Sequence, residues 1–124
     1  MNKVEFGRQG EELAAQTLKE NGYRILERNL RTRFGEIDLV ARDGNILCFV
    51  EIRAKKSLRF GWPEESVGRL KQARLVRLAQ WYLQRYRVSG MPIRFDVVSI
   101  LFGPDGAPAR TRLIQGAFDT SRGV

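Results

Sequence analysis

Acidic and basic side chains are concentrated between Gly35 and Lys56, in the otherwise apolar segment GEIDLVARDGNILCFVEIRAKK. Asp38 and Glu51 lie in its two halves and are predicted to be diagonal neighbours on one face of a hairpin, with backbones roughly 7–8 Å apart. Two carboxylates crowded in a partly buried site raise each other's pKa, and a hard divalent cation removes that cost. The spacing therefore predicts a site for Mg²⁺ or Mn²⁺ that can polarise a phosphodiester.

Two cations could stabilise the negative charge that develops on phosphorus beside this site. Arg53 is on the strand of Glu51, and Lys71 is predicted to point inward from the apolar stripe of the following helix. Simpler interpretations exist for single residues. Glu36 or Glu51 could form a surface ion pair with a nearby arginine, and Lys71 could extend its ammonium to solvent over the helix edge. A set of acids on buried strands is harder to explain in this way than any one acid.

The chain of 124 residues carries a net charge of +8 and contains no histidine. Excess positive charge indicates a polyanionic partner, with nucleic acid first and an anionic membrane surface second, although a basic surface that serves only solubility stays open. The absence of histidine excludes Ser-His-Asp and Cys-His catalysis and the usual zinc sites. Carboxylates, lysines and hard metal ions are the chemistry that is left.

Length favours a single domain over residues 1–124, with its core at about residues 4–102. No apolar run reaches the roughly 20 residues that a membrane span needs, and the first residues lack a signal-peptide core. The single Cys48 is predicted to be a small buried hydrophobe. We therefore expect a cytoplasmic protein that does not enter the membrane.

Hydrophobic periodicity predicts the order α-β-β-β-α-β, with an optional last strand. In the hairpin, Asp43 and Gly44 are predicted to be the two central residues of a type I′ turn, which pairs Asp38 with Phe49. One face then carries four charged residues, and the other, which begins at Ile37, is wholly apolar, so helices should cover both faces.

The chain is predicted to form seven segments in order. They are a helix over Val4–Asn21, a strand over Tyr23–Arg31, the hairpin over Gly35–Lys56, a helix from Trp62-Pro63 to about Arg87, a strand over Ile93–Phe102, the optional edge strand over Arg110–Phe118 and a loose tail over 119–124. The inward stripe of the second helix is predicted to include Leu70 and Tyr86.

The segment GEIDLVARDG-x3-CFVEIR, an acid followed by a hairpin and then Glu-x-basic, resembles the core motif of the PD-(D/E)XK nuclease superfamily. From FGRQGEELAAQTLKENGYRIL through FGWPEESV and RFDVVSI, about residues 6–101, the chain closely resembles the uncharacterised YraN-type family of small bacterial proteins. This resemblance implies a restriction endonuclease-like fold, a mixed β-sheet flanked by helices, related to archaeal Holliday junction resolvases.

Carried over by residue, the resemblance makes three acids the metal ligands: Asp38, Glu51 and Glu11. Position 53 matches the motif lysine, and Arg53 stands there; arginine can clamp a phosphate but cannot carry a proton near neutral pH. Lys71 or Lys55 would then supply the missing ammonium. Gln72 is expected as a polar neighbour of the site and Glu36 as a supporting acid.

Three functions stay open: a metal-dependent nuclease, a nucleic-acid-binding module with weak or no catalysis, and a protein-interaction factor. The third depends only on Trp62, Trp81 and the tyrosines, most of which are expected in the core. For the first two, DNA is favoured over RNA, with branched or structured DNA as the favoured substrate. Related resolvases are dimers, which makes a homodimer a further expectation. The arginines predicted to contact phosphates are Arg31, Arg33, Arg59, Arg69, Arg74 and Arg77, with Arg85 and Arg87 further along the helix.

Overall fold

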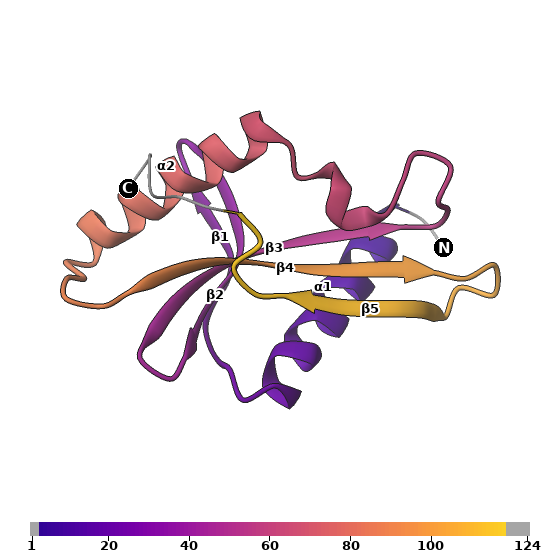
Figure 1. Cartoon of the computed structure of the whole chain (residues 1–124), viewed down its shortest axis with the longest axis horizontal. Coiled ribbons are helices and arrows are strands. Elements are labelled where there is room, and N and C mark those ends of the chain that lie inside the picture. The colour runs from indigo at the N-terminus through magenta and orange to yellow at the C-terminus, as the bar shows by residue number, and fades with distance from the viewer. Residues whose placement is uncertain (1–2, 119–124) are drawn as a thin grey trace.

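The computed structural model describes residues 3–118, which form a five-stranded mixed sheet with two α-helices (Figure 1). The predicted order is confirmed, including the last strand; the tail predicted over 119–124 lies outside the described residues. Neither described α-helix is long and apolar enough to cross a membrane. The elements are α1 (Lys3–Glu20), β1 (Arg24–Thr32), β2 (Gly35–Asp43), β3 (Ile46–Lys55), the 3₁₀ helix η1 (Pro63–Ser66), α2 (Arg69–Arg85), β4 (Ile93–Phe102) and β5 (Pro108–Ile114).

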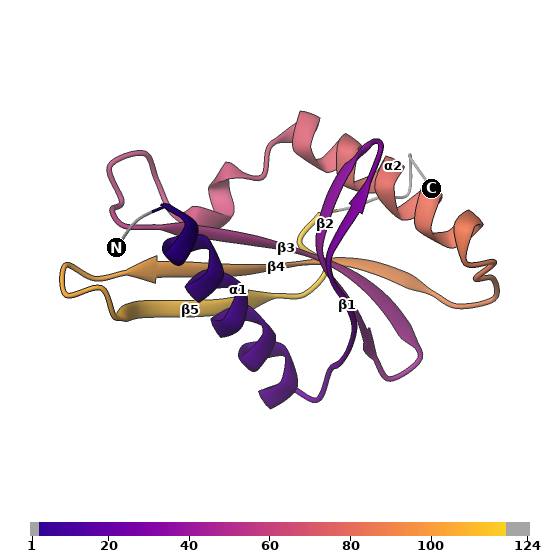
Figure 2. The same ribbon diagram turned by 180° about the vertical axis from the view of Figure 1, so that it is seen from behind.

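The strands lie side by side in the order in which they occur along the chain. Strands β3 and β4 are parallel, and a parallel pair needs a long crossover connection, which η1 and α2 provide. Helix α2 lies over one face of the sheet and α1 over the opposite face (Figure 2). Phe49 packs on the α2 side and Val50 on the α1 side, so β3 is buried on both faces as predicted.

The second helical segment is divided, and the prediction of one helix from Trp62-Pro63 to Arg87 is wrong. The 3₁₀ helix η1 ends at Ser66, Gly68 is extended with φ −81° and ψ −177°, and α2 begins at Arg69. Leu75 and Leu78 of α2 are buried, but Leu70 and Tyr86, which were predicted to face inward, lie at the two ends of this helix and are 89% and 45% exposed.

The β2–β3 turn differs from the predicted one. Asp43 pairs with Ile46, so the two turn residues are Gly44 and Asn45 rather than Asp43 and Gly44. Gly44 has φ +61° and is the first turn residue, where a type II′ turn requires glycine. The register is shifted by two residues, so the partner of Phe49 is Val40, and the predicted pairing of Asp38 with Phe49 is wrong.

Strands β2 and β3 separate beyond the pair Leu39–Val50, where their ladder ends. Beyond this point β2 stays paired with β1 as far as Gly35, and β3 stays paired with β4 as far as Lys55. Figure 1 shows the two pairs diverging, with the β1–β2 turn on one arm and the loop after β3 on the other. We call this divergence the strand fork.

The alternation of side chains along β2 also changes at the strand fork. Ile37 was predicted to share a face with Leu39, but it packs with Val40 on the α2 side, whereas Leu39 packs on the α1 side. Two residues three positions apart can share a face only if the pleat is interrupted between them. The interruption falls at Asp38 and Leu39, so the predicted single face of acids does not extend through Asp38.

A buried ionic cluster holds the opposite end of the sheet. The side chain of Asp96 is fully buried and accepts hydrogen bonds from Tyr23 Oη at 2.6 Å and Arg94 Nε at 2.8 Å. Burial by itself would raise the pKa of Asp96, but the hydrogen bonds from Arg94 and Tyr23 hold it below its usual value. Arg94 also contacts Asp43 at 2.9 Å and so ties the β2–β3 turn to β4.

Replacing Arg94 by methionine should destabilise the protein by about 3 kcal/mol, because it leaves the Asp96 carboxylate buried without a counter-ion. Urea unfolding at neutral pH measures this free energy. Arg42→Met removes an exposed arginine of β2 and serves as the matched control, with an expected change below about 0.5 kcal/mol. If the two variants lose the same free energy of unfolding, the ionic cluster makes no specific contribution to stability.

Candidate active site

Glu51 is a buried acid beside the strand fork, with 5% of its surface exposed. Its Oε2 lies 3.3 Å from Nζ of Lys71, and the Asp38 side chain lies within hydrogen-bonding reach. Burial, together with the hydrogen bond and negative charge of Asp38, raises the pKa of Glu51 to about 8, and Lys71 opposes the rise. We call Asp38 and Glu51 the carboxylate pair.

The strand fork sets the position of Asp38. Beyond Leu39 the backbone of β2 no longer follows β3, and the amide of Ile52 donates instead to Asp38 Oδ2 at 2.9 Å. Asp38 also lines a hollow of about 260 Å³ beside α1, together with Glu11. The predicted proximity of Asp38 and Glu51 is present, but it arises from the separation of the strands rather than from a diagonal pairing.

Glu11 lies near the carboxylate pair without joining it. Its Oε1 accepts a hydrogen bond from Asn29 Nδ2 at 2.6 Å, within the lining of the same hollow. Helix α1 lies close to β3 here, since Gly10 is buried and a Cβ at that position would make an ordinary contact of 3.6 Å with Cβ of Ala54. Within residues 3–118, no three Asp, Glu or Cys side chains form a group able to hold a metal ion.

Among the predicted cations, Lys71 contacts the carboxylate pair. It lies in the first turn of α2, with 26% of its side chain exposed. Arg53 has its Nε bound to Ser66 Oγ at 2.7 Å, so η1 fixes its guanidinium. Lys55 donates to the carbonyl oxygen of Phe60 at 3.3 Å. Of the two lysines, Lys71 is thus the one whose ammonium contacts Glu51.

The two predicted supporting residues have their hydrogen bonds elsewhere. Glu36 is exposed and accepts from Arg31 Nε at 3.1 Å, so the interpretation as a surface ion pair applies to this residue. Gln72 Nε2 donates to the carbonyl oxygen of Val67 at 2.9 Å and closes the break before α2. Neither bond reaches the carboxylate pair.

The arginines predicted to contact phosphates are all exposed and are spread over several elements. Three of them lie at or beside the β1–β2 turn: the ion pair of Arg31 is there, Arg33 lies over the Phe34 ring, and Arg74 of α2 lies against Gly35. Arg59 lies over Phe60 in the loop after β3. The others are on α2, namely Arg69, Arg77 and Arg85, and in the turn after it, Arg87.

Sequence reasoning missed the contacts that fix η1 beside this site. Glu64 accepts hydrogen bonds from Ser99 Oγ at 2.5 Å and from Arg110 Nη2 at 2.9 Å. The guanidinium of Arg110 lies 4.0 Å from the ring centroid of Trp62. A serine within the apolar run RFDVVSI was the available signal, because a buried hydroxyl needs a partner. These contacts hold η1 against β4 and β5, and η1 carries Ser66, the hydrogen-bond partner of Arg53.

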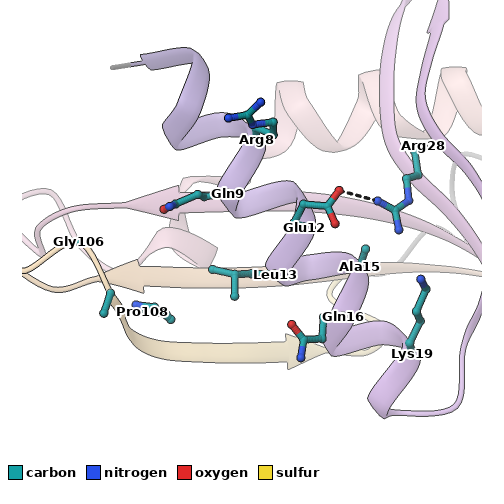
Figure 3. A pocket seen from close by; sticks show the side chains of 11 residues that line it. Arg8, Gln9, Glu12, Leu13, Ala15, Gln16, Lys19, Arg28, Gly106 and Pro108 are labelled. Carbon is teal, nitrogen blue, oxygen red and sulfur yellow. Dashed lines mark hydrogen bonds and ion pairs between the residues drawn. The ribbon is translucent and has the colours of Figure 1, made fainter. Parts of the chain in front are cut away.

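A wider hollow of about 590 Å³ lies along α1 (Figure 3). Residues of α1 line it together with Arg28 of β1 and the β4–β5 turn at Gly106. Glu12 is the one acid in this lining, and it is paired with Arg28 at 2.9 Å. A single acid that already has a counter-ion offers no metal site, so the strand fork is the stronger candidate.

A mixed sheet between two helices, with buried carboxylates beside the central strands, is consistent with a nuclease-like fold. Residues 10–100 match the family described as Uncharacterised protein family UPF0102, and the chain belongs to this family, which confirms the YraN-type resemblance. A UPF0102 protein of Symbiobacterium thermophilum is 52% identical over 112 residues, covering 90% of this chain and 94% of the relative. A UPF0102 protein of Caldicellulosiruptor saccharolyticus is 42% identical over 118 residues, covering 95% of this chain and all of the relative.

Replacing Glu51 by glutamine should stabilise the metal-free protein at about pH 9 but not at pH 5. The pKa of Glu51 is raised from 4.5 to about 8 on folding, so the folded state binds the extra proton between these values. The stability of the unmodified protein therefore falls as the pH rises through this window, and glutamine avoids the fall. In EDTA at pH 9, we expect a melting temperature at least about 3 °C higher than that of the unmodified protein.

The matched control for this prediction is Glu36→Gln, the same change at an exposed acid of the same hairpin. It should leave the melting temperature nearly unchanged at both pH values. A Glu51→Gln protein that melts below the unmodified protein at pH 9 would contradict the prediction. It would show that losing the contact with Lys71 costs more stability than is gained by removing the buried charge.

Proposed function

We propose that this protein is a metal-dependent nuclease that hydrolyses phosphodiester bonds in DNA, with branched or otherwise structured DNA as its substrate. The observation that carries the proposal is a buried glutamate, Glu51, that shares its site with a second carboxylate and with the Lys71 ammonium. A raised pKa means that two ionised carboxylates are unfavourable there without a cation. Groups of this kind are concentrated at functional sites.

The donor set fits a hard divalent cation. Asp38 and Glu51 offer only oxygen ligands, and Mg²⁺ is typically bound through one or two carboxylates while it keeps waters for substrate phosphates. They would hold Mg²⁺ or Mn²⁺, and Glu11, beside Asp38 in the same hollow, is the nearest further acid on α1. When bound, such an ion supplies the polarisation of the phosphodiester and the activation of water near neutral pH.

The remaining roles belong to the cations of the chain. Lys71 favours the ionised form of Glu51 and presents an ammonium to the negative charge that develops on the phosphate oxygens. Arg53, whose Nε is held by Ser66, can turn its terminal nitrogens toward a phosphate. The exposed arginines contact the backbone of the substrate and fix its position.

A second candidate function is a nucleic-acid-binding module with weak or no catalysis. The observation that favours it is Arg53, which stands at the motif lysine position, has its Nε engaged by Ser66, and cannot carry a proton near neutral pH. The net charge of +8 supports binding in either case. The interaction-factor hypothesis is weaker, because Trp62 lies against Arg110 and Trp81 packs on the core.

Lys71→Ala should reduce metal-dependent cleavage of branched DNA by at least about 100-fold, since it removes a cation positioned at the reacting phosphate. Asp38→Ala should reduce cleavage at least as much. Lys19→Ala is the matched control, because it removes an exposed ammonium in the last turn of α1. Its rate should stay within about 3-fold of the unmodified protein.

Cleavage is measured with labelled branched, flapped and single-stranded DNA in Mg²⁺ or Mn²⁺. A rate that is unaffected by Asp38→Ala would identify a contaminating nuclease. A protein that binds DNA and cuts none of these substrates in either metal would favour the binding module.

Binding to DNA should weaken steeply with salt, because each neutralised phosphate releases condensed counterions. Arg74→Ala at the β1–β2 turn should lower the slope of log K against log salt by about one. Arg42→Ala, an exposed arginine further along β2, is the control and should leave the slope unchanged. Affinity that does not depend on salt would contradict nucleic-acid binding as the function.

A further inference from the structure

The tripeptide Arg-Phe-Gly occurs twice in the chain, at residues 33–35 and 59–61. The first copy forms the β1–β2 turn on one arm of the strand fork, and the second lies in the loop after β3 on the other arm. Phe34 is 43% exposed and Phe60 is 81% exposed. A single exposed ring is common on protein surfaces and needs no explanation. Two exposed rings that occur in the same tripeptide, one on each arm of the strand fork, do need one.

The local backbone holds both rings outward. The glycine after each phenylalanine is left-handed, with φ +134° at Gly35 and +92° at Gly61, so the chain turns away behind each ring. The amide of Phe34 donates to Thr32 Oγ1 at 2.9 Å, and the carbonyl oxygen of Phe60 accepts from Lys55 at 3.3 Å. The rings are thus presented from fixed turns rather than from loose chain.

Each ring lies beside cations suited to phosphate. The guanidinium carbon of Arg33 is 5.0 Å from the centroid of Phe34, and that of Arg59 is 5.4 Å from the centroid of Phe60. Proteins that bind single strands combine a basic track for the backbone with aromatic rings on which bases stack. The repeated pairing of one ring with one guanidinium matches that chemistry on both arms.

The two rings lie on the two arms that diverge at the carboxylate pair. Phe34 is four residues from Asp38 along the β2 arm, and Lys55, which contacts the Phe60 carbonyl, is four residues from Glu51 along β3.

We propose that Phe34 and Phe60 are stacking sites for unpaired nucleobases on the two sides of the strand fork, so that the protein selects DNA with single-stranded segments over continuous duplex. A duplex hides the faces of its bases within the stack, and only unpaired bases offer a face to a protein ring. The inference takes nucleic acid as the ligand from the proposed function, but it does not depend on cleavage.

The test is fluorescence anisotropy with a labelled single-stranded oligonucleotide, a fork with unpaired arms and a blunt duplex, all in EDTA. The double variant Phe34→Ala, Phe60→Ala should bind the single strand and the fork at least about 10-fold more weakly, and the blunt duplex less than about 2-fold more weakly. Phe34→Trp, Phe60→Trp should restore binding. Leu70→Ala, which truncates a side chain that is 89% exposed and has no ring, is the matched control and should change neither affinity.

Equal weakening for all three DNAs, or none, would overturn the inference, as would a tryptophan variant that fails to restore binding. Repeating the measurement in the Asp38→Ala background separates the inference from the proposed function. Ring-dependent preference that persists in Asp38→Ala supports the stacking sites independently of cleavage. An otherwise unmodified protein that shows this preference but cuts no DNA in Mg²⁺ or Mn²⁺ supports the stacking sites and rejects the nuclease, whereas one that cuts DNA without any ring-dependent preference does the reverse.

Discussion

The hydrogen bond from the Ile52 amide to the Asp38 carboxylate marks the point where the β2–β3 ladder stops, and the rest of the site depends on that stop. If the ladder continued by one pair, Asp38 would lie directly opposite Glu51 as an ordinary cross-strand pair. Instead β2 turns away with β1, and a side chain takes over a backbone amide beside β3. The two carboxylates therefore meet at the strand fork.

The two ends of the sheet have opposite electrostatic arrangements. At the β2–β3 turn the Asp96 carboxylate has hydrogen bonds from Arg94 and Tyr23, and its pKa is held low. At the strand fork the pKa of Glu51 is raised, because burial and a second acid outweigh one lysine. The Asp96 end thus tethers the β2–β3 turn, and the carboxylate whose charge is unfavourable lies at the strand fork. Strongly perturbed pKa values of this kind are concentrated at functional sites.

Hydrophobic periodicity predicted the element order, the burial of β3 on both faces and the inward direction of Lys71, because each depends on which face of an element is apolar. It could not predict the turn. Asp-Gly and Gly-Asn are both good turn pairs, and the two registers differ by two residues, which leaves every face unchanged. Contacts such as Arg53 with Ser66 depend on where η1 lies in three dimensions, so no local pattern specifies them.

Position 53 carries an arginine that contacts Ser66, and the ammonium beside Glu51 belongs to Lys71 of α2. In the motif that the chain resembles, the lysine follows the glutamate on the same strand, and its place is fixed by strand geometry alone. Here Lys71 reaches Glu51 from α2. It shares a side of that helix with the buried Leu75 and Leu78, whereas Leu70, one residue earlier, is exposed. The direction of the ammonium beside Glu51 therefore follows from the apolar stripe of a helix and not from strand geometry.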